Sequence, residues 1–263
     1  MYQLTKMNAY KTLRDRTFWI LIGICLLIEL WVYVPRAAFD VFVYTGADPK
    51  YNRYLEFFKR KVATNPTLID DVLRRGFTLP TLSFFASYSF VFCGRERKSR
   101  LFENLCAIRR DRTEVFFANL LWLVLTVIPF LLINQCMLAI ASKISAPEKT
   151  VGDVSVLFPY YFSVFVVAAF FASLTYSVYM LSHSSVLPVG IYVFFSTISL
   201  FHPATADVPV LGYITKLDLI DIVHKLAEVR TWKDCFNLSI WLIPVIIVSV
   251  LVSAFVVQKR DLK

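Results

Sequence analysis

The stretch VFFANLLWLVLTVIPFLLINQCMLAIA, residues 115–141, decides the fold, because it carries no charged side chain over a length that suits a membrane crossing. A hydrocarbon core of about 30 Å requires roughly 20 residues of α-helix. Backbone groups in lipid must be bonded within the protein, and the apolar pattern is continuous rather than alternating. We therefore expect a transmembrane helix here, and not a strand of a barrel.

Five other apolar stretches predict further crossings. They lie at residues 17–34, 77–92, 154–181, 186–200 and 238–257. The stretches 77–92 and 186–200 are slightly short, and apolar or small flanking residues can extend each by a turn. The predicted fold class is all-α, a polytopic membrane protein with six transmembrane helices and additional interfacial amphipathic helices.

The composition agrees with a chain built in lipid. Of the 263 residues, 57% are hydrophobic and only 18% are charged, with a mean hydropathy of +0.61. This leaves too little polar surface to cover a soluble globule. No soluble segment exceeds about 40 residues, so the net charge of +9 is interpreted as a topology signal, and nucleic acid is not an expected partner. We predict a single transmembrane domain, residues 1–263, in the plasma membrane.

Basic residues in the connecting segments predict the orientation. One set comprises residues 1–16, 94–114, 182–185 and 258–263. The other set comprises residues 35–76, 142–155 and 201–237. Each set carries 14 Lys and Arg, but the first concentrates them in 47 residues and the second spreads them over 93. The positive-inside rule counts basic residues close to the membrane, so we place both termini in the cytoplasm and the second set outside it.

Three connecting segments have the pattern of amphipathic helices at a membrane surface. In residues 1–16, apolar side chains recur three apart beside basic ones, and a short positively charged tail is the alternative. These apolar side chains are Leu4, Met7, Tyr10 and Leu13. In the segment 35–76, aromatic and basic residues alternate over 50–61, which indicates an amphipathic helix. One or two further helical turns are expected at 68–73. In 201–237, the pattern over 214–228 indicates a helix on or in the outer leaflet.

The segment GRERKSRLFENLCAIRRDRTE, residues 94–114, is the most informative stretch between the predicted crossings. Leu101, Leu105 and Ile108 fall at positions i, i+4 and i+7, which places one apolar stripe on a short helix over 99–108. Such a helix would lie parallel to the membrane on the cytoplasmic side. A basic loop with incidental helicity is the other interpretation, and the pattern alone does not separate the two.

The sequence contains no pattern typical of catalysis or metal binding. Its seven glycines form no phosphate loop, and neither an H-E-x-x-H nor a G-x-S-x-G motif is present. The histidines and cysteines are too scattered to predict a metal site. We therefore expect a non-enzymatic chain that binds no cofactor itself. Glu29 is an intramembrane charge, for which we favour a structural role over one in transport.

Three separated segments carry a resemblance to a known family. They are NAYKTLRDRTFWI at 8–20, AIRRDRTEVFFANLL at 107–121 and FVVQKRDLK at 255–263. In this order they resemble the start of the first span, the cytoplasmic coupling segment and the usual ending of six-span permeases of type 2 ATP-binding-cassette (ABC) exporters. Three places depart from that pattern: Asn8 stands where an acidic residue is common, Asn119 where a lysine is common, and Ser99-Arg100 where Gly-Thr is common after the second span.

The resemblance implies a permease whose ATPase is a separate chain. A separate ABC ATPase, two copies per complex, would bind ATP and magnesium and dock on the cytoplasmic face. A second permease half, identical or paralogous, would complete the path within the lipid. The implied ATPase-contact residues are Leu101, Phe102, Glu103, Leu105, Ile108, Arg109, Arg112 and Glu114. The pathway-lining candidates are Thr81, Ser83, Ser87, Tyr88, Ser196 and Thr197, for which ordinary helix packing is the alternative.

The predicted function is therefore the membrane-spanning permease subunit of an ABC exporter. Aromatic-rich spans with few charges favour an amphipathic or hydrophobic substrate, such as a peptide, an antibiotic or a lipid. A membrane-embedded enzyme and a non-transporting scaffold are the alternatives. Copurification of an ATPase would distinguish the permease from both.

Overall fold

The computed structural model describes residues 2–33, 67–76, 79–109, 111–145, 149–182, 184, 186–195, 217 and 219–259. Over these residues the fold is all-α, as predicted, with one isolated bridge between Thr67 and Thr150 as its extended pairing. The helices are α1 (Tyr2–Leu13), α2 (Arg16–Tyr33), α5 (Leu68–Gly76), α6 (Leu79–Ser99), α7 (Leu101–Arg109), α8 (Arg112–Leu125), α9 (Val127–Ser145), the 3₁₀ turn η2 (Val154–Val156), α10 (Leu157–Ser182), α13 (Leu219–Glu228) and α14 (Trp232–Lys259). A further helical segment covers 187–195.

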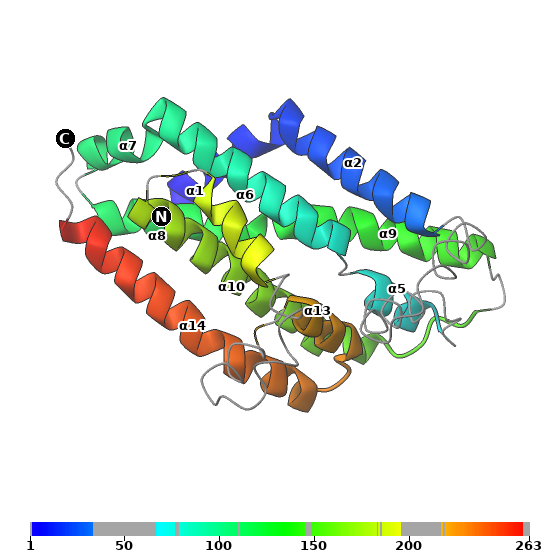
Figure 1. Ribbon diagram of the computed structural model, residues 1–263. Helices are drawn as coiled ribbons and strands as arrows, with labels where there is room; N and C mark the ends of the chain where they lie inside the picture. The colour runs from blue at the N-terminus through cyan, green and yellow to red at the C-terminus, as the bar shows by residue number, and fades with distance from the viewer. Residues whose placement is uncertain are drawn as a thin grey trace, which may run out of the picture.

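The long helices run alternately away from and toward one end of the bundle (Figure 1). Helix α2 leaves the end that holds α1 and α7, and α6 returns to it. Helices α8 and α9 lead away again, α10 comes back, the segment 187–195 leaves, and α14 returns. We call this the α7 end. Helix α1 and the last turn of α14 therefore lie at the same end of the bundle.

Three helical stretches of the described chain are long and apolar enough to cross a membrane. They are Arg112–Ile140, Val154–Ser182 and Trp232–Lys259, which correspond to the third, fourth and sixth predicted crossings. Helix α2 supplies a shorter apolar stretch, Arg16–Ile28. Helix α6 covers the second predicted crossing but continues into the charged sequence GRERKS, and the fifth is described only as far as residue 195. The molecule therefore has the character of a helical membrane protein.

The third predicted crossing is divided between α8 and α9, and the division has a local cause. Pro129 has no backbone N–H to donate to the carbonyl of Leu125, four residues earlier. At the break, the Thr126 N–H donates to the Trp122 carbonyl at 3.0 Å, and its hydroxyl donates to the Leu123 carbonyl at 2.6 Å. The threonine hydroxyl thus supplies a hydrogen bond to the Leu123 carbonyl where the regular helical pattern ends.

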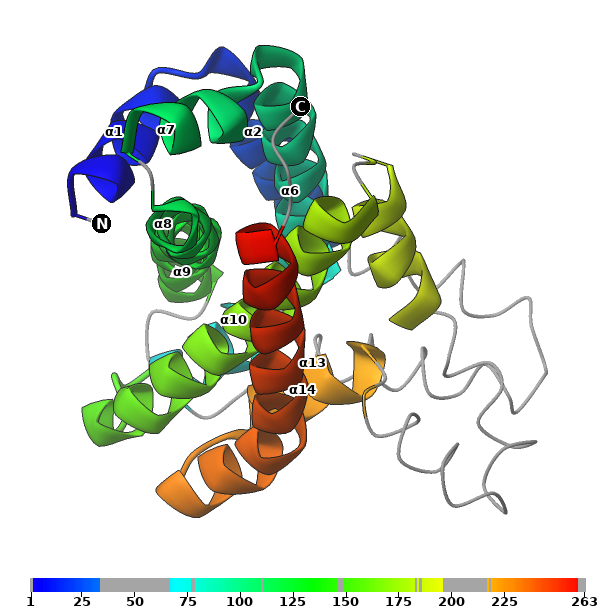
Figure 2. The same cartoon turned by 90° about the vertical axis from the view of Figure 1, so that its left-hand side faces the viewer.

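Helix α10 lies at the centre of the bundle and is buried on most of its circumference. Aromatic rings stack against it: Phe171 on Tyr192 with ring centroids 5.2 Å apart, and Phe116 on Tyr176 at 5.4 Å. On another side α14 crosses it (Figure 2). There the Ser177 hydroxyl donates to a carbonyl of α14 at 3.0 Å, as small polar residues do where helices approach closely.

Helices α5 and α13 cover the end of the bundle opposite α7. Both confirm helices expected from the sequence, at 68–73 and within 214–228. The apolar face of α13, however, is buried in protein: Ile222, Val223 and Leu226 are at most 1% exposed, and the helix packs on α5, α10 and α14. The prediction that this face contacts the outer leaflet is therefore wrong for these residues. The helix expected over 50–61 lies outside the described residues.

Two sets of polar contacts hold this end together. The Arg230 guanidinium donates to the Asp70 carboxylate of α5 at 3.2 Å and to the Ala227 carbonyl of α13 at 3.0 Å. Backbone N–H groups at the start of α5 donate to the carbonyls of residues 150 and 151. Gly152 follows with a φ of +88°, where a Cβ would lie 2.7 Å from the Thr67 hydroxyl oxygen. Only glycine fits this approach without strain.

Candidate functional site

The segment 94–114 reverses the direction of the chain at the α7 end, and most of its described residues are helical. Helix α6 continues to Ser99, so GRERKS extends the second predicted crossing. Arg100 then reverses the chain in the left-handed region, with a φ of 47°, and α7 follows. The Ser99 hydroxyl donates to the Arg95 carbonyl at 2.7 Å and closes the end of α6. The short helix expected over 99–108 is therefore present, as Leu101–Arg109.

Helix α8 begins at a well-defined cap that sequence reasoning missed. The Asp111 carboxylate accepts from the Glu114 N–H at 3.1 Å and from the Thr113 hydroxyl at 2.7 Å. The signal was present, because Asp followed three residues later by Glu is a common start of a helix. Arg112, in the first turn, donates to the Gln258 carbonyl at 3.4 Å. The start of α8 is thus tied to the end of α14.

A small apolar cluster, separate from the main core, fixes α7 against α1 and α8. Leu4, Cys106, Val115 and Ala118 are its buried members, and Val115 and Ala118 are fully inaccessible. Met7, Phe102 and Leu105 are half-buried against them. Part of the apolar stripe assigned to an ATPase contact is therefore already used inside this chain, because Leu105 packs against this cluster.

The other predicted contact residues divide by exposure. The Glu103 side chain is 42% exposed and lies 4.0 Å from the Arg100 guanidinium, while Asn104 and Ala107 are exposed. Arg112 and Glu114 are half-buried. The side chains of Leu101, Ile108 and Arg109 lie outside the described part of the chain. Glu103, Asn104 and Ala107 therefore form the accessible face of α7.

Helix α1 packs on the protein through Leu4 and two polar side chains, whereas we expected its apolar stripe to face the membrane surface. Leu4, Asn8 and Thr12, spaced four apart, are buried, whereas Tyr10 and Leu13 are 58% and 50% exposed. The helix itself is confirmed, and Figure 2 shows it beside α7, arching over α8 and α9. The buried polar side chains Asn8 and Thr12 face a largely apolar bundle, and each has a hydrogen-bond partner.

A buried hydrogen-bond network, which we call the Asn119 network, links four helices. The Asn119 amide of α8 donates to the Glu96 carboxylate of α6 at 2.5 Å and to the Tyr176 hydroxyl of α10 at 2.9 Å. Its carbonyl oxygen accepts from the Asn8 amide of α1 at 2.8 Å. Tyr176 also donates to Glu96, at 2.9 Å. All four side chains are at most 3% exposed, so water cannot replace these bonds.

Two of the three departures from the pattern that the resemblance implies therefore meet in space. Asn8 and Asn119 are 111 residues apart in sequence and form one hydrogen bond. In place of the acidic residue and the lysine that the resemblance led us to expect, this chain has two neutral amides, which bond to each other. Glu96 was not singled out by the sequence, because it lies inside a run of basic residues that resembles a solvated loop.

A second buried set joins α1, α6 and α8. The Thr12 hydroxyl bonds to the Tyr88 hydroxyl at 2.7 Å and accepts from the Trp122 indole at 2.9 Å. Tyr88, a pathway-lining candidate, is thus 3% exposed and engaged in helix packing within this chain, and Thr81 is also fully buried. Ser87 is half-buried. The side chains of Ser83, Ser196, Thr197 and Glu29 lie outside the described part.

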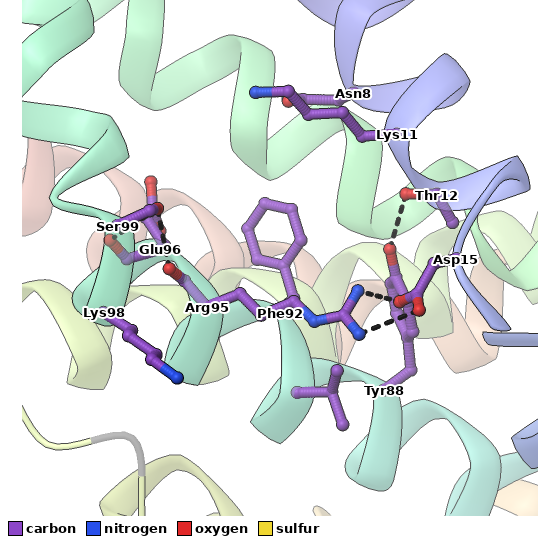
Figure 3. A pocket seen from close by; sticks show the side chains of 11 residues that line it. Asn8, Lys11, Thr12, Asp15, Tyr88, Phe92, Arg95, Glu96, Lys98 and Ser99 are labelled. Atoms are coloured by element: carbon purple, nitrogen blue, oxygen red, sulfur yellow. Dashed lines mark hydrogen bonds and ion pairs between the residues drawn. The ribbon is translucent and has the colours of Figure 1, made fainter. Parts of the chain in front are cut away.

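A cleft of about 660 Å³ lies between α1 and the C-terminal half of α6 (Figure 3). At its mouth the Arg95 guanidinium donates both of its terminal nitrogens to the Asp15 carboxylate, one of them at 2.8 Å, and also reaches the Thr17 hydroxyl at 2.9 Å. Desolvation disfavours ionisation of Asp15, but these hydrogen bonds outweigh it and lower its pKa below the usual value. Lys11 and Lys98 complete the basic lining.

The long apolar helices, the buried polar contacts between them and the amphipathic helix at one end define a helical multi-pass membrane protein. Within the described residues no group of His, Cys, Asp and Glu could hold a metal ion. Residues 4–199 match the model of the ABC-2 family transporter protein, and the chain belongs to this family. It is thus a permease subunit of an ABC transporter, a class that generally works with an ABC ATPase. Neither a search of curated proteins nor one of solved structures finds a match.

Proposed function

We propose that this permease exports an amphipathic or hydrophobic substrate, such as a peptide, an antibiotic or a lipid, using a separate ATPase subunit. In this proposal the chain crosses the membrane six times with both termini in the cytoplasm, and two permease halves pair with two ATPase copies. Family membership supports the general role. The accessible face of α7, held at the end of the bundle that also carries α1 and the end of α14, supports the position of the ATPase contact.

The connections of α7 suit it to transmit force. It joins α6 through the single residue Arg100 and α8 through the capped turn at Asp111, so neither connection is long enough to absorb a displacement. Beyond these turns, the Asn119 network bonds α6, α8 and α10 to one another. A push on α7 during closure of the ATPase dimer would therefore move these helices as a unit and rock the two permease halves.

Charge reversal on the accessible face of α7 tests the contact. Glu103→Arg should lower the amount of ATPase that copurifies with the tagged permease, because rim charges help set partner recognition. Glu228→Arg is a matched control: it also reverses an exposed glutamate, which lies 3.4 Å from the His224 imidazole, but on α13 at the opposite end. Equal ATPase recovery with both variants, at equal permease expression, would refute this contact.

Leu105→Asp is a less informative variant than the sequence pattern suggests. Leu105 packs against the cluster around Cys106 and Val115, so a buried aspartate there would disturb α7 itself. Loss of the ATPase in that variant could follow from misfolding. Variants of the exposed residues Asn104 and Ala107 avoid this ambiguity.

Substrate class can be tested on the assembled transporter. ATP hydrolysis by the reconstituted complex should rise with amphipathic peptides or lipids and not with small ions, if the cargo has the proposed character. Failure to recover any ATPase with the wild-type chain would instead favour a scaffold or another membrane activity.

A further inference from the structure

The cleft between α1 and α6 has the chemistry of a site for a phosphate-bearing group. Three cationic side chains line it, Lys11, Arg95 and Lys98, against two carboxyl groups, Asp15 and Glu96. Even with both carboxyl groups ionised, three positive and two negative charges leave the cleft positive by one. Asp15 is already matched by Arg95, and both lysines are exposed. Their charges are therefore available to a ligand.

The surrounding aromatic side chains place the cleft at the membrane interface. Trp19, 45% exposed, donates its indole N–H to the Leu13 carbonyl at 2.8 Å, in the turn that joins α1 to α2. Tyr10 is exposed on the side of α1 that faces away from the cleft. Tryptophan and tyrosine concentrate at the level of lipid headgroups, with their rings partly in the apolar layer. Asp15 and Arg95 lie at this same turn, at the mouth of the cleft.

Apolar side chains also form part of the cleft. Val91 and Phe92 form part of its lining and are half-buried. A ligand with a charged head and apolar chains could thus bind its head to the basic side chains and place the start of its chains against Val91 and Phe92.

We propose that this cleft binds the phosphate headgroup of an anionic phospholipid, with Lys11 and Lys98 as its main cationic contacts. Basic pockets next to membrane helices are suited to such headgroups, and the amphipathic profile of the site favours a lipid over a free phosphate compound. The bound lipid would hold α1 against α6 beside the Asn119 network. This role concerns α1 and does not depend on which substrate is transported.

The test uses the purified full-length chain in mild detergent with short-chain phosphatidylglycerol as the probe, read by native mass spectrometry. Lys11→Gln/Lys98→Gln should weaken binding roughly 10- to 30-fold, because each lysine near a headgroup contributes on the order of 1 kcal/mol. Lys225→Gln/Lys233→Gln, two exposed lysines at the opposite end, is the matched control and should bind as the wild type does. Each single variant, Lys11→Gln or Lys98→Gln, should give an intermediate loss.

Two comparisons identify the source of the phosphate. Soluble glycerol phosphate should not displace the lipid at equal concentration, and phosphatidylcholine should bind more weakly than phosphatidylglycerol. Equal binding by the cleft and control variants would overturn the proposal, as would displacement by glycerol phosphate as effective as that by the lipid. Melting temperatures within the range of the control variant show that a loss of binding is not a loss of fold.

Discussion

Replacement of Asn119 by leucine tests the buried network that joins four helices. Leucine has a similar size, so packing changes little, but three hydrogen bonds are lost. These are the bonds to Glu96 at 2.5 Å, to Tyr176 at 2.9 Å and from Asn8 at 2.8 Å. Interhelical bonds in membrane proteins average about 0.6 kcal/mol, and typical buried bonds about 1 kcal/mol, so the expected loss is about 2 to 3 kcal/mol.

The loss can be measured from the thermal unfolding of the detergent-purified chain. At about 2 to 4 °C per kcal/mol for a chain of this size, the melting temperature of Asn119→Leu should fall by roughly 4 to 12 °C. Asn8→Ala removes one of the three bonds and should lower the melting temperature by about a third of that amount. Asn237→Leu makes the same change as Asn119→Leu at an exposed position of α14 and serves as the control. If Asn119→Leu has the same melting temperature as the control variant, the network does not stabilise the bundle.

Further predictions concern both ends of the bundle. Asn8→Asp should destabilise α1 when made alone. Adding Asn119→Lys should restore the melting temperature, because the two side chains would then form an ion pair. A double variant that melts no higher than Asn8→Asp would count against their contact. Arg230→Ala should cost about 1 to 2 kcal/mol and speed hydrogen exchange in α13, because the contact to α5 is lost; unchanged exchange would contradict that role. Gly152→Ala should cost a similar amount, about 1 to 2 kcal/mol, from its backbone strain and its clash with Thr67, and a neutral substitution would refute this.

The apolar helices could be predicted because their cause is local. Length and continuous apolarity identify a helix in lipid whatever its partners are, and the described helices coincide with the predicted stretches. The amphipathic patterns at 94–114 and 214–228 likewise gave α7 and α13. The direction in which an amphipathic face points is not local, so the apolar face of α13 was assigned to lipid although the protein itself covers it.

The polar contacts could not be predicted because they form between distant segments. Asn8 and Thr12 resemble ordinary surface residues of a short helix until α8 is placed beside them. Glu96 lies within GRERKS and was counted as part of a charged loop, yet the continuation of α6 carries it into the bundle. The break at Thr126 and the cap at Asp111, by contrast, follow from nearby residues and were available in the sequence.

The side of the membrane on which α7 lies tests the central claim most directly. Glu103→Cys can be probed with a membrane-impermeant maleimide in a Cys136→Ser background, since Cys136 is the one exposed native cysteine within the described residues. The proposed orientation predicts that Glu103→Cys reacts only after the cells are permeabilised, whereas Lys233→Cys reacts in intact cells. Labelling of Glu103→Cys in intact cells would place α7 outside the cytoplasm, and no ATPase could then act on it.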